Sequence, residues 1–273
     1  MALTNRLAII AGGLGGLGST TGKMLRAQGA RLALLYAPFE ADRTQELLRR
    51  GYGDDFAADE IRTYECDVSS PVSVQAAFGA ISSDLAASAA PAFPSILINS
   101  AGYVSLSDLE DTPPEETVKH LNVNILGPML CSQAFTKLYL AAVSAASSTP
   151  PPPPPPPGRI VSISSQAAHV SLWRHGAYCA SKAGLMGLTR SMASEWGPKG
   201  ITANTVSPTV AWTELGQKAW GDREVADAFL RTVPTGRFCL PEEVAEAVAF
   251  LCRDSSGMIN GADIKIDGGF TIR

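Results

Sequence analysis

Short apolar runs alternate with helical segments along the chain, and this alternation restricts the fold more than any other feature. The apolar runs cover residues 7–10, 31–36, 61–66, 96–98, 159–163, 202–206 and 262–266. Helical segments lie between them at 19–28, 43–50, 72–85, 115–146 (bent near Gly127-Pro128), 177–196 and 242–252. Apolar strands separated by helices form parallel sheets that are buried on both faces. The sequence therefore predicts an α/β fold, a doubly wound parallel sheet of about seven strands, as one domain over residues 1–273.

Composition and charge exclude several classes of protein. Hydrophobic residues make up 45% of the 273 residues, which is enough for a large core and excludes disorder of the whole chain. A net charge of -4 gives no electrostatic footprint for nucleic acid or an anionic membrane. No apolar run reaches the roughly 20 residues that span a bilayer. Residues 1–5 lack the basic and apolar regions of a signal peptide.

The five cysteines lack the spacing of a metal site. An odd number of cysteines without a CxxC pair favours free thiols in a reducing compartment. We therefore expect a cytoplasmic protein without a metal, and without a nucleic-acid or membrane partner.

An unbroken run of prolines interrupts the alternating pattern at residues 150–157. It follows a helical segment and precedes an apolar run, so residues 147–158 are predicted to form an inserted surface loop. Eight prolines in polyproline II would extend over about 25 Å, at roughly 3.1 Å each. Such a loop is either a docking site for an SH3- or WW-type partner or a low-complexity insertion at a tolerant position.

A glycine-rich segment, residues 11–18 (AGGLGGLG), directly follows the first apolar run and opens a helix. Glycines let the backbone turn sharply and approach a pyrophosphate, which then lies at the helix N-terminus. The segment stands at the first strand–helix junction of an alternating chain, which is the context that a dinucleotide-binding loop requires.

Tyr178 and Lys182 are four residues apart in a helical segment, which places them on one helix face. Ser165 follows the fifth apolar run, at the carboxyl edge of the sheet. Hydride transfer to a carbonyl leaves an alkoxide that must be protonated. A tyrosine can donate that proton, a nearby ammonium lowers its pKa, and a serine hydroxyl polarises the carbonyl oxygen. The three residues are therefore candidates for carbonyl reduction.

Several motifs agree in order and spacing with one known family. Residues 158–165 (GRIVSISS) and 178–182 (YCASK), together with 99–102 (NSAG) and Asn124, resemble the active-site motifs of the short-chain dehydrogenase/reductase family. The glycine loop resembles that family's TGxxxGxG loop. Ala11, Ser100 and Thr209 depart from the usual threonine, asparagine and glycine. The resemblance covers the chain apart from the proline run, and it implies a Rossmann-type fold that uses NAD(P)(H).

The resemblance also implies roles for individual residues. Ser165 would polarise the substrate oxygen, Tyr178 would act as acid and base, Lys182 would tune Tyr178 and hold the ribose, and Asn124 would order a proton relay. The implied cofactor contacts, besides Tyr178 and Lys182, are Gly12, Leu14, Gly16, Leu17, Gly18, Tyr36, Asp67, Val68, Asn99, Ala101, Gly102, Pro208, Val210 and Thr213.

The last third of the chain narrows the resemblance. Residues 207–220 resemble dicarbonyl/L-xylulose reductases, and residues 261–270 also resemble fungal mannitol and sorbose reductases. Both comparisons imply interconversion of polyols and ketoses, with a substrate lid at about 209–235. Ser165, Tyr178, Gln166, His175 and Trp220 are the predicted substrate contacts. The sequence leaves open whether His169, Trp173 and Trp212 face the site.

The end of the second apolar run bears on the choice of cofactor. An acidic residue there binds the adenine ribose and favours NAD, whereas a basic residue favours NADP. Tyr36 and Ala37 are neither, and the absence of an acid removes repulsion against a 2′-phosphate. Arg43 could also turn toward the phosphate. The sequence therefore favours NADP(H) over NAD(H).

The sequence predicts an NAD(P)(H)-dependent oxidoreductase that interconverts a small ketone or ketose and the corresponding alcohol or polyol. Two alternatives stay open: a reductase of 3-oxoacyl thioesters, and a cofactor-sensing scaffold protein that docks through its proline run. The family resemblance further implies a homotetramer.

Overall fold

The computed structural model describes residues 2–54, 57, 60–147, 154–219 and 222–272. Its sheet has seven strands in the order β3-β2-β1-β4-β5-β6-β7, and every neighbouring pair is parallel. The predicted α/β fold is therefore confirmed. The strands are β1 (Arg6–Ala11), β2 (Arg31–Tyr36), β3 (Ile61–Glu65), β4 (Phe93–Asn99), β5 (Gly158–Ile163), β6 (Ile201–Pro208) and β7 (Asp263–Ile266).

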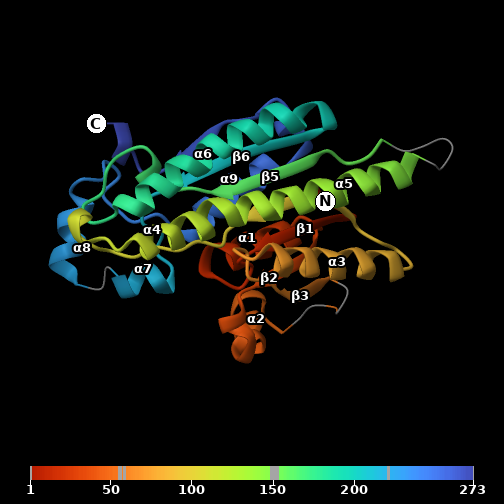
Figure 1. Cartoon of the computed structure of the whole chain (residues 1–273), viewed down its shortest axis with the longest axis horizontal. Helices are drawn as coiled ribbons and strands as arrows, with labels where there is room; N and C mark the ends of the chain where they lie inside the picture. The colour runs from red at the N-terminus through yellow and green to blue at the C-terminus, as the bar shows by residue number, and fades with distance from the viewer. Residues whose placement is uncertain (1, 55–56, 58–59, 148–153, 220–221, 273) are drawn as a thin grey trace.

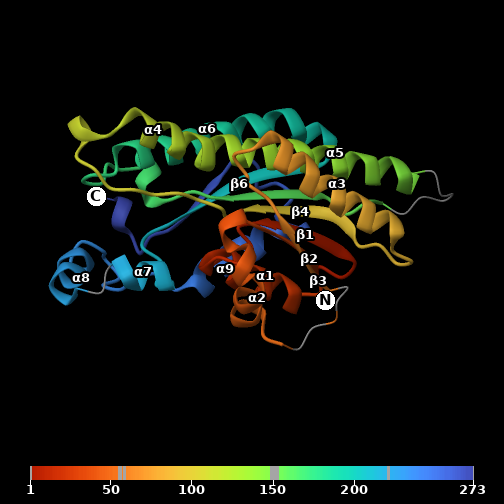
Figure 2. The same cartoon turned by 60° about the horizontal axis from the view of Figure 1, so that its bottom comes forward.

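Helices cover both faces of the sheet, as Figures 1 and 2 show. The helices are α1 (Gly16–Ala27), α2 (Thr44–Tyr52), α3 (Pro71–Ala87), α4 (Pro114–Leu121), α5 (Gly127–Ser147), α6 (Gly176–Trp196), α7 (Glu214–Ala219), α8 (Arg223–Leu230) and α9 (Pro241–Cys252). Helices α3 to α6 lie over one face, and α1, α2 and α9 lie under the other (Figure 2). No helix within the described residues is long and apolar enough to cross a membrane.

The period of two along the strands explains why both faces are covered. In β1, Ala8 and Ile10 point into the core beneath α1 and α9, whereas Leu7, Ile9 and Ala11 point into the core beneath α3 and α5. All six residues of β1 are buried. Burying apolar side chains on both faces favours a central strand of a parallel sheet over an exposed one.

The long helical region predicted for residues 115–146 is two helices joined by one π-helical turn. That turn covers Asn122–Leu126, so the break precedes the predicted bend at Gly127-Pro128 and contains Asn124. A second unpredicted element is the 3₁₀ helix Pro38–Arg43, which begins directly after β2. Both elements lie at the carboxyl edge of the sheet, where ligands bind in folds of this type.

Half of the proline run, residues 150–153, lies outside the described part of the chain. Its last residues run from 154 into β5, and side chains from the sheet and α5 hold them. The buried Arg6 donates to the Pro157 carbonyl at 2.7 Å, and Tyr139 donates to the Pro156 carbonyl at 3.2 Å. All five cysteines are free thiols, as expected, and four of them are buried.

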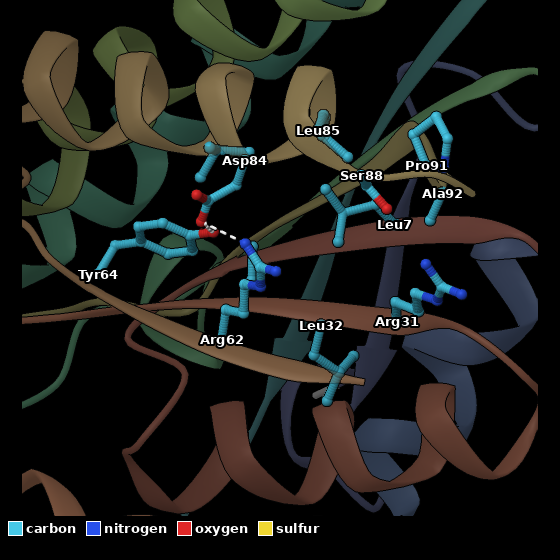
Figure 3. Close-up of a pocket in the computed structure, with 12 residues that line it drawn as sticks. Leu7, Arg31, Leu32, Arg62, Tyr64, Asp84, Leu85, Ser88, Pro91 and Ala92 are labelled. Carbon is cyan, nitrogen blue, oxygen red and sulfur yellow. Dashed lines mark hydrogen bonds and ion pairs between the residues drawn. The ribbon is translucent and has the colours of Figure 1, made fainter. Parts of the chain in front are cut away.

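A small hollow opens at the opposite, amino edge of the sheet, between α3 and the starts of β1 to β3 (Figure 3). Its polar side chains already satisfy one another. Tyr64 donates to Asp84 at 2.7 Å, and Arg62 forms an ion pair with the same carboxylate at 2.8 Å. Arg31 donates to the Ala90 carbonyl. The hollow therefore lacks the unpaired polar groups of a binding site.

Candidate active site

The glycine loop connects β1 to α1 and lies against the end of β2. The amides of Gly12 and Gly13 both donate to the Leu35 carbonyl, at 3.0 and 3.1 Å. Gly12 has φ +76°, and a Cβ built on it would lie 2.7 Å from the Ala101 nitrogen. A Cβ on Gly18 would overlap the Gly12 carbonyl oxygen. The loop can therefore fold this tightly only with glycine at these two positions.

The other predicted cofactor contacts surround this loop. Thr213 packs its methyl group over Gly16, and Val68 packs on Gly127 at the start of α5. Asp67 accepts two hydrogen bonds from Ser69, at 2.9 and 2.6 Å. The remaining predicted contacts lie on the segments that meet here: Tyr36 ends β2, Asn99 ends β4, Ala101 and Gly102 follow it, and Pro208 and Val210 lie at the end of β6.

Three of the predicted cofactor contacts have side chains held by the protein itself, wholly or in part. The Leu14 side chain is buried in the core, and Leu17 packs against the same core. The Asn99 amide donates to Ser132 and Ser162, at 3.2 and 3.1 Å, and so ties β4 to α5 and β5. The buried Leu14 can therefore contact a cofactor only through its backbone.

Tyr178 and Lys182 lie on the same face of α6, as their spacing predicts. The Lys182 ammonium is 5.6 Å from the centre of the Tyr178 ring and donates to the Ile163 carbonyl at 2.9 Å. Burial lowers the pKa of Lys182 from 10.5 to about 8. Burial also raises the pKa of Tyr178, and a hydrogen bond with Ser165 partly offsets this rise. The structure therefore brings Ser165, Tyr178 and Lys182 into one cluster.

Asn124 is fully buried in the π-helical turn, and its side chain is held by neighbouring groups. Its Oδ1 accepts from the Tyr103 amide and its Nδ2 donates to the Tyr103 carbonyl, both at 2.8 Å. Nδ2 also donates to Ser181 at 2.9 Å. A Cβ on Gly102 would lie 3.6 Å from Asn124 Oδ1 and 3.7 Å from Lys182 Nζ, so all three residues meet at one point.

A network that the sequence analysis did not identify borders Tyr178. The buried His120 on α4 accepts from the Ser105 amide at 3.1 Å, and its other ring nitrogen meets the Glu116 carbonyl at 2.7 Å. The Glu116 carboxylate accepts from Tyr103 and Ser105, at 2.8 and 2.7 Å. The HxxxN spacing before Asn124 was the only local signal, and it does not reveal that His120 contacts Tyr178.

The predicted substrate residues have different environments. Gln166 is 3% exposed, and its Oε1 has no hydrogen-bond partner in the described structure. His175 lies beside Tyr178, with ring centroids 6.1 Å apart, and its Nδ1 donates to the Trp173 carbonyl at 2.6 Å. Trp220 lies outside the described residues. Gln166 and His175 are therefore the substrate candidates that the structure brings to the cluster.

The three residues whose direction the sequence left open are now placed. His169 pairs with Asp263 on β7 at 2.9 Å, and the Trp173 side chain is 86% exposed. Trp212 stacks on Phe238, with ring centroids 4.6 Å apart and an angle of 16° between the planes. Phe238 in turn stacks on Phe229 of α8. Trp212 therefore anchors the segment predicted to be a lid.

Glu40 places a carboxylate at the end of β2, where the sequence analysis found no acidic residue. In the 3₁₀ helix after β2, Glu40 Oε2 accepts from the Ala37 amide at 2.8 Å. Arg43, which could have received a 2′-phosphate, forms two hydrogen bonds with Glu46, at 3.0 and 2.9 Å.

Comparison with known proteins agrees with this geometry. A family model described as enoyl-(acyl carrier protein) reductase matches residues 12–271. A D-threitol dehydrogenase of Mycolicibacterium smegmatis is 39% identical over 99% of this chain and 95% of its own length. An L-xylulose reductase of Cavia porcellus is 32% identical over 99% and 98%. A short-chain dehydrogenase/reductase from Serratia marcescens superposes with a TM-score of 0.82 at 28% identity, covering 99% of this chain and 100% of that one.

The chain belongs to the short-chain dehydrogenase/reductase family, and it is an oxidoreductase that acts on CH–OH groups. Members of this family use NAD(P)(H). The residues present fit such a cofactor, because the glycine cradle at Gly12 and Gly18 has no room for a Cβ and the helix behind it, α1, has Gly15 as an N-cap without a side-chain hydrogen bond. The buried, unpaired oxygens of Asn99, which ends β4, and of Thr209, which directly follows β6, lie at the same sheet edge.

Proposed function

We propose that this protein interconverts a small ketose or ketone and the corresponding polyol or alcohol, using NAD(P)(H). The observation that carries the proposal is the Ser165–Tyr178–Lys182 cluster with the buried, unpaired Gln166 oxygen following Ser165. An unpaired buried acceptor costs free energy unless a ligand donates to it, and a substrate hydroxyl is such a donor. The dehydrogenase and reductase relatives act on threitol and xylulose by name, which supports a polyol or ketose substrate.

The proposed chemistry assigns one task to each side chain. When bound, the nicotinamide supplies or accepts the hydride. Tyr178 is a protonated phenol at neutral pH, since burial raises its pKa, and it gives its proton to the alkoxide during reduction. Ser165 holds the substrate oxygen. The Lys182 ammonium favours the phenolate that must form in the oxidative direction.

We propose a different role for Asn124 from the relay that the resemblance implied. Its side-chain amide is committed to Tyr103 and Ser181, so it acts as a positioning residue that holds the loop after β4 against Lys182. The π-helical turn that carries Asn124 is a feature often found at functional sites.

The choice between the two nicotinamide cofactors stays a prediction. Tyr36 and Ala37 carry no charge, and on that ground the sequence favours NADP(H). The Glu40 carboxylate at the end of β2 opposes that preference.

We also propose a cytoplasmic homotetramer that binds a small-molecule substrate, with residues 209–235 as its lid. The free thiols support a reducing compartment. The tetramer follows from the family resemblance, and light scattering of the purified protein tests it. Pull-down with SH3 and WW domains, with and without residues 150–157, tests the proline run as a docking element.

The test of function is initial-rate kinetics on the purified protein. D-threitol and xylitol are offered with NAD⁺ and NADP⁺, and L-xylulose and diacetyl with NADH and NADPH. The proposal is supported if the protein turns over any of these substrates and the substitution Tyr178→Phe abolishes that turnover. Turnover only of acetoacetyl thioesters would transfer the assignment to the 3-oxoacyl reductases. Binding of cofactor without turnover of any of these substrates would favour the sensor.

A further inference from the structure

The carboxyl end of β2 lies directly against the glycine loop. The Leu35 carbonyl in β2 accepts from the amides of Gly12 and Gly13, so hydrogen bonds hold the strand end and the loop together. In dinucleotide-binding folds of this topology, the adenine ribose lies at this strand end. A carboxylate there accepts from the ribose 2′-hydroxyl, and an arginine there receives a 2′-phosphate.

Glu40 brings a carboxylate back to this position although it lies four residues beyond the strand. Ala37 has an extended backbone, and the 3₁₀ helix Pro38–Arg43 then turns the chain. The Glu40 amide donates to the Ala37 carbonyl at 2.8 Å, and Glu40 Oε2 accepts from the Ala37 amide at 2.8 Å. The two reciprocal bonds fix the half-buried carboxylate on the first residue after β2.

The second oxygen of Glu40 receives no hydrogen bond from the described residues, so it can accept one from a ligand hydroxyl. The nearby arginines already hold carboxylates. Arg43 is paired with Glu46, and Arg50 reaches from α2 to Glu214 at the start of α7, at 2.7 Å. A 2′-phosphate at this strand end would therefore face the Glu40 carboxylate and would have to displace a carboxylate to gain an arginine.

We infer that Glu40 replaces the acidic residue that is missing at the end of β2 and makes the protein select NAD(H) over NADP(H). The inference rests on the proposed use of a nicotinamide cofactor. The carboxylate gains a hydrogen bond from a free 2′-hydroxyl and repels a 2′-phosphate through like charge. The selection therefore acts mainly against the phosphate.

Direct binding tests this inference without turnover. The purified protein is titrated with NAD⁺ and NADP⁺, and with 5′-AMP and adenosine 2′,5′-bisphosphate, by isothermal calorimetry. We expect NAD⁺ to bind at least about tenfold more tightly than NADP⁺. Glu40→Gln keeps an acceptor for the Ala37 amide but removes the charge, so we expect it to narrow that ratio about tenfold, chiefly by strengthening NADP⁺ binding.

Asp42→Asn is the matched control, because it removes the same charge from an exposed position of the same 3₁₀ helix. We expect it to leave the ratio within about twofold. Glu46→Gln removes the carboxylate partner of Arg43, so it measures how much a released Arg43 contributes to NADP⁺ binding. Thermal melts verify that each variant is folded.

Equal or tighter binding of NADP⁺ by the unmodified protein would overturn the inference, and so would equal shifts in Glu40→Gln and Asp42→Asn. Loss of binding of both dinucleotides would overturn this inference and the proposed function together. Selective binding of NAD⁺ without turnover of polyols or ketoses would support this inference and contradict only the substrate assignment.

Discussion

The imidazole of His120 lies edge-on to the phenol ring of Tyr178, with ring centroids 6.3 Å apart and planes at 68°. Because the Ser105 amide donates to Nε2, the proton of the neutral ring is on Nδ1, which donates to the Glu116 carbonyl. His120 therefore joins α4, the loop after β4 and the candidate acid in one packed unit.

Substitutions of His120 should separate its ring packing from its hydrogen bonds. In His120→Phe the ring still packs on Tyr178, but the Ser105 amide loses its acceptor. We expect the KM for a polyol to rise about tenfold with kcat within about threefold. His120→Ala also removes the ring, so kcat should fall about tenfold and stability by about 2–4 kcal/mol. Steady-state kinetics and urea unfolding measure both, and wild-type kinetics in His120→Ala would contradict the role.

Gln166 should affect substrate binding and stability in opposite directions. Its Oε1 is buried without a partner, so Gln166→Leu removes an unsatisfied acceptor and should stabilise the fold by about 1 kcal/mol. The same change removes the proposed partner of a substrate hydroxyl, so KM for a polyol should rise at least about tenfold. Diacetyl, which has no hydroxyl, serves as the control substrate, and its KM should change little. An equal loss for both substrates would contradict the hydrogen bond.

Local sequence patterns predicted the parts of the site that depend on local geometry. Tyr178 and Lys182 are four apart on one helix, and the glycine loop directly follows a strand, so spacing alone places them. His120 and Tyr178 are far apart in sequence and meet only through the packing of α4 on α6, which no local pattern reveals. The same applies to His169, whose partner Asp263 lies on the last strand.

The position of the Glu40 carboxylate could be predicted only in part from the local sequence. Its capping bond to Ala37 spans three residues, so the pattern of a strand end followed four residues later by a glutamate could have been found in the sequence. The sequence pattern marks only Tyr36 and Ala37 as the strand end, and it does not predict the 3₁₀ helix that brings the Glu40 side chain back to them.

Lys182 should destabilise the folded protein at neutral pH. Burial lowers its pKa to about 8 from 10.5, so between these values the unfolded state binds more protons and stability rises with pH. Below pH 8 the folded state carries the whole cost of burying the charge. Lys182→Met should therefore be more stable than the unmodified protein at pH 7, by about 2 kcal/mol, while losing activity.

Urea unfolding at pH 7 and pH 10 measures this effect. The advantage of Lys182→Met should shrink at the higher pH, where the lysine is neutral in the folded state. Lys199→Met, at an exposed position of the 3₁₀ turn after α6, is the control and should change stability by less than about 0.5 kcal/mol at either pH. A variant that is less stable than the unmodified protein at pH 7 would show that the lysine's packing outweighs its charge.

Alanine substitutions at different glycines of the loop should differ sharply in their effect on stability and cofactor binding. A Cβ on Gly18 would overlap the Gly12 carbonyl, so Gly18→Ala should cost more than about 2 kcal/mol and abolish dinucleotide binding. Gly15 has φ −72°, and its Cβ would meet only the Gly12 carbonyl, at 3.4 Å. The free energy of unfolding of Gly15→Ala should therefore lie within about 0.5 kcal/mol of that of the unmodified protein. Equal melting temperatures for the two variants would contradict the geometry of the loop.

Arg6 should be among the strongest polar contributors to stability away from the candidate active site. The residue is 3% exposed, and its guanidinium donates to Ser95 at 2.7 Å, the Cys252 carbonyl at 3.1 Å, Asp254 at 3.0 Å and the Pro157 carbonyl at 2.7 Å. It thus ties β1 to β4, to the end of α9 and to the end of the proline segment. Burial lowers its pKa, yet the nearby carboxylate and carbonyls keep the charge paired.

Arg6→Met fills the space but leaves the buried Ser95 hydroxyl and two carbonyls without their donor, so it should cost about 3 kcal/mol in urea unfolding. Asp254→Asn removes only the ion-pair partner, whose side chain is 70% exposed, and should cost less than about 1 kcal/mol. Equal losses in the two variants would mean that the ion pair carries the effect of Arg6. The larger loss in Arg6→Met would instead assign it to the buried hydrogen bonds that hold the ends of α9 and the proline segment to the sheet.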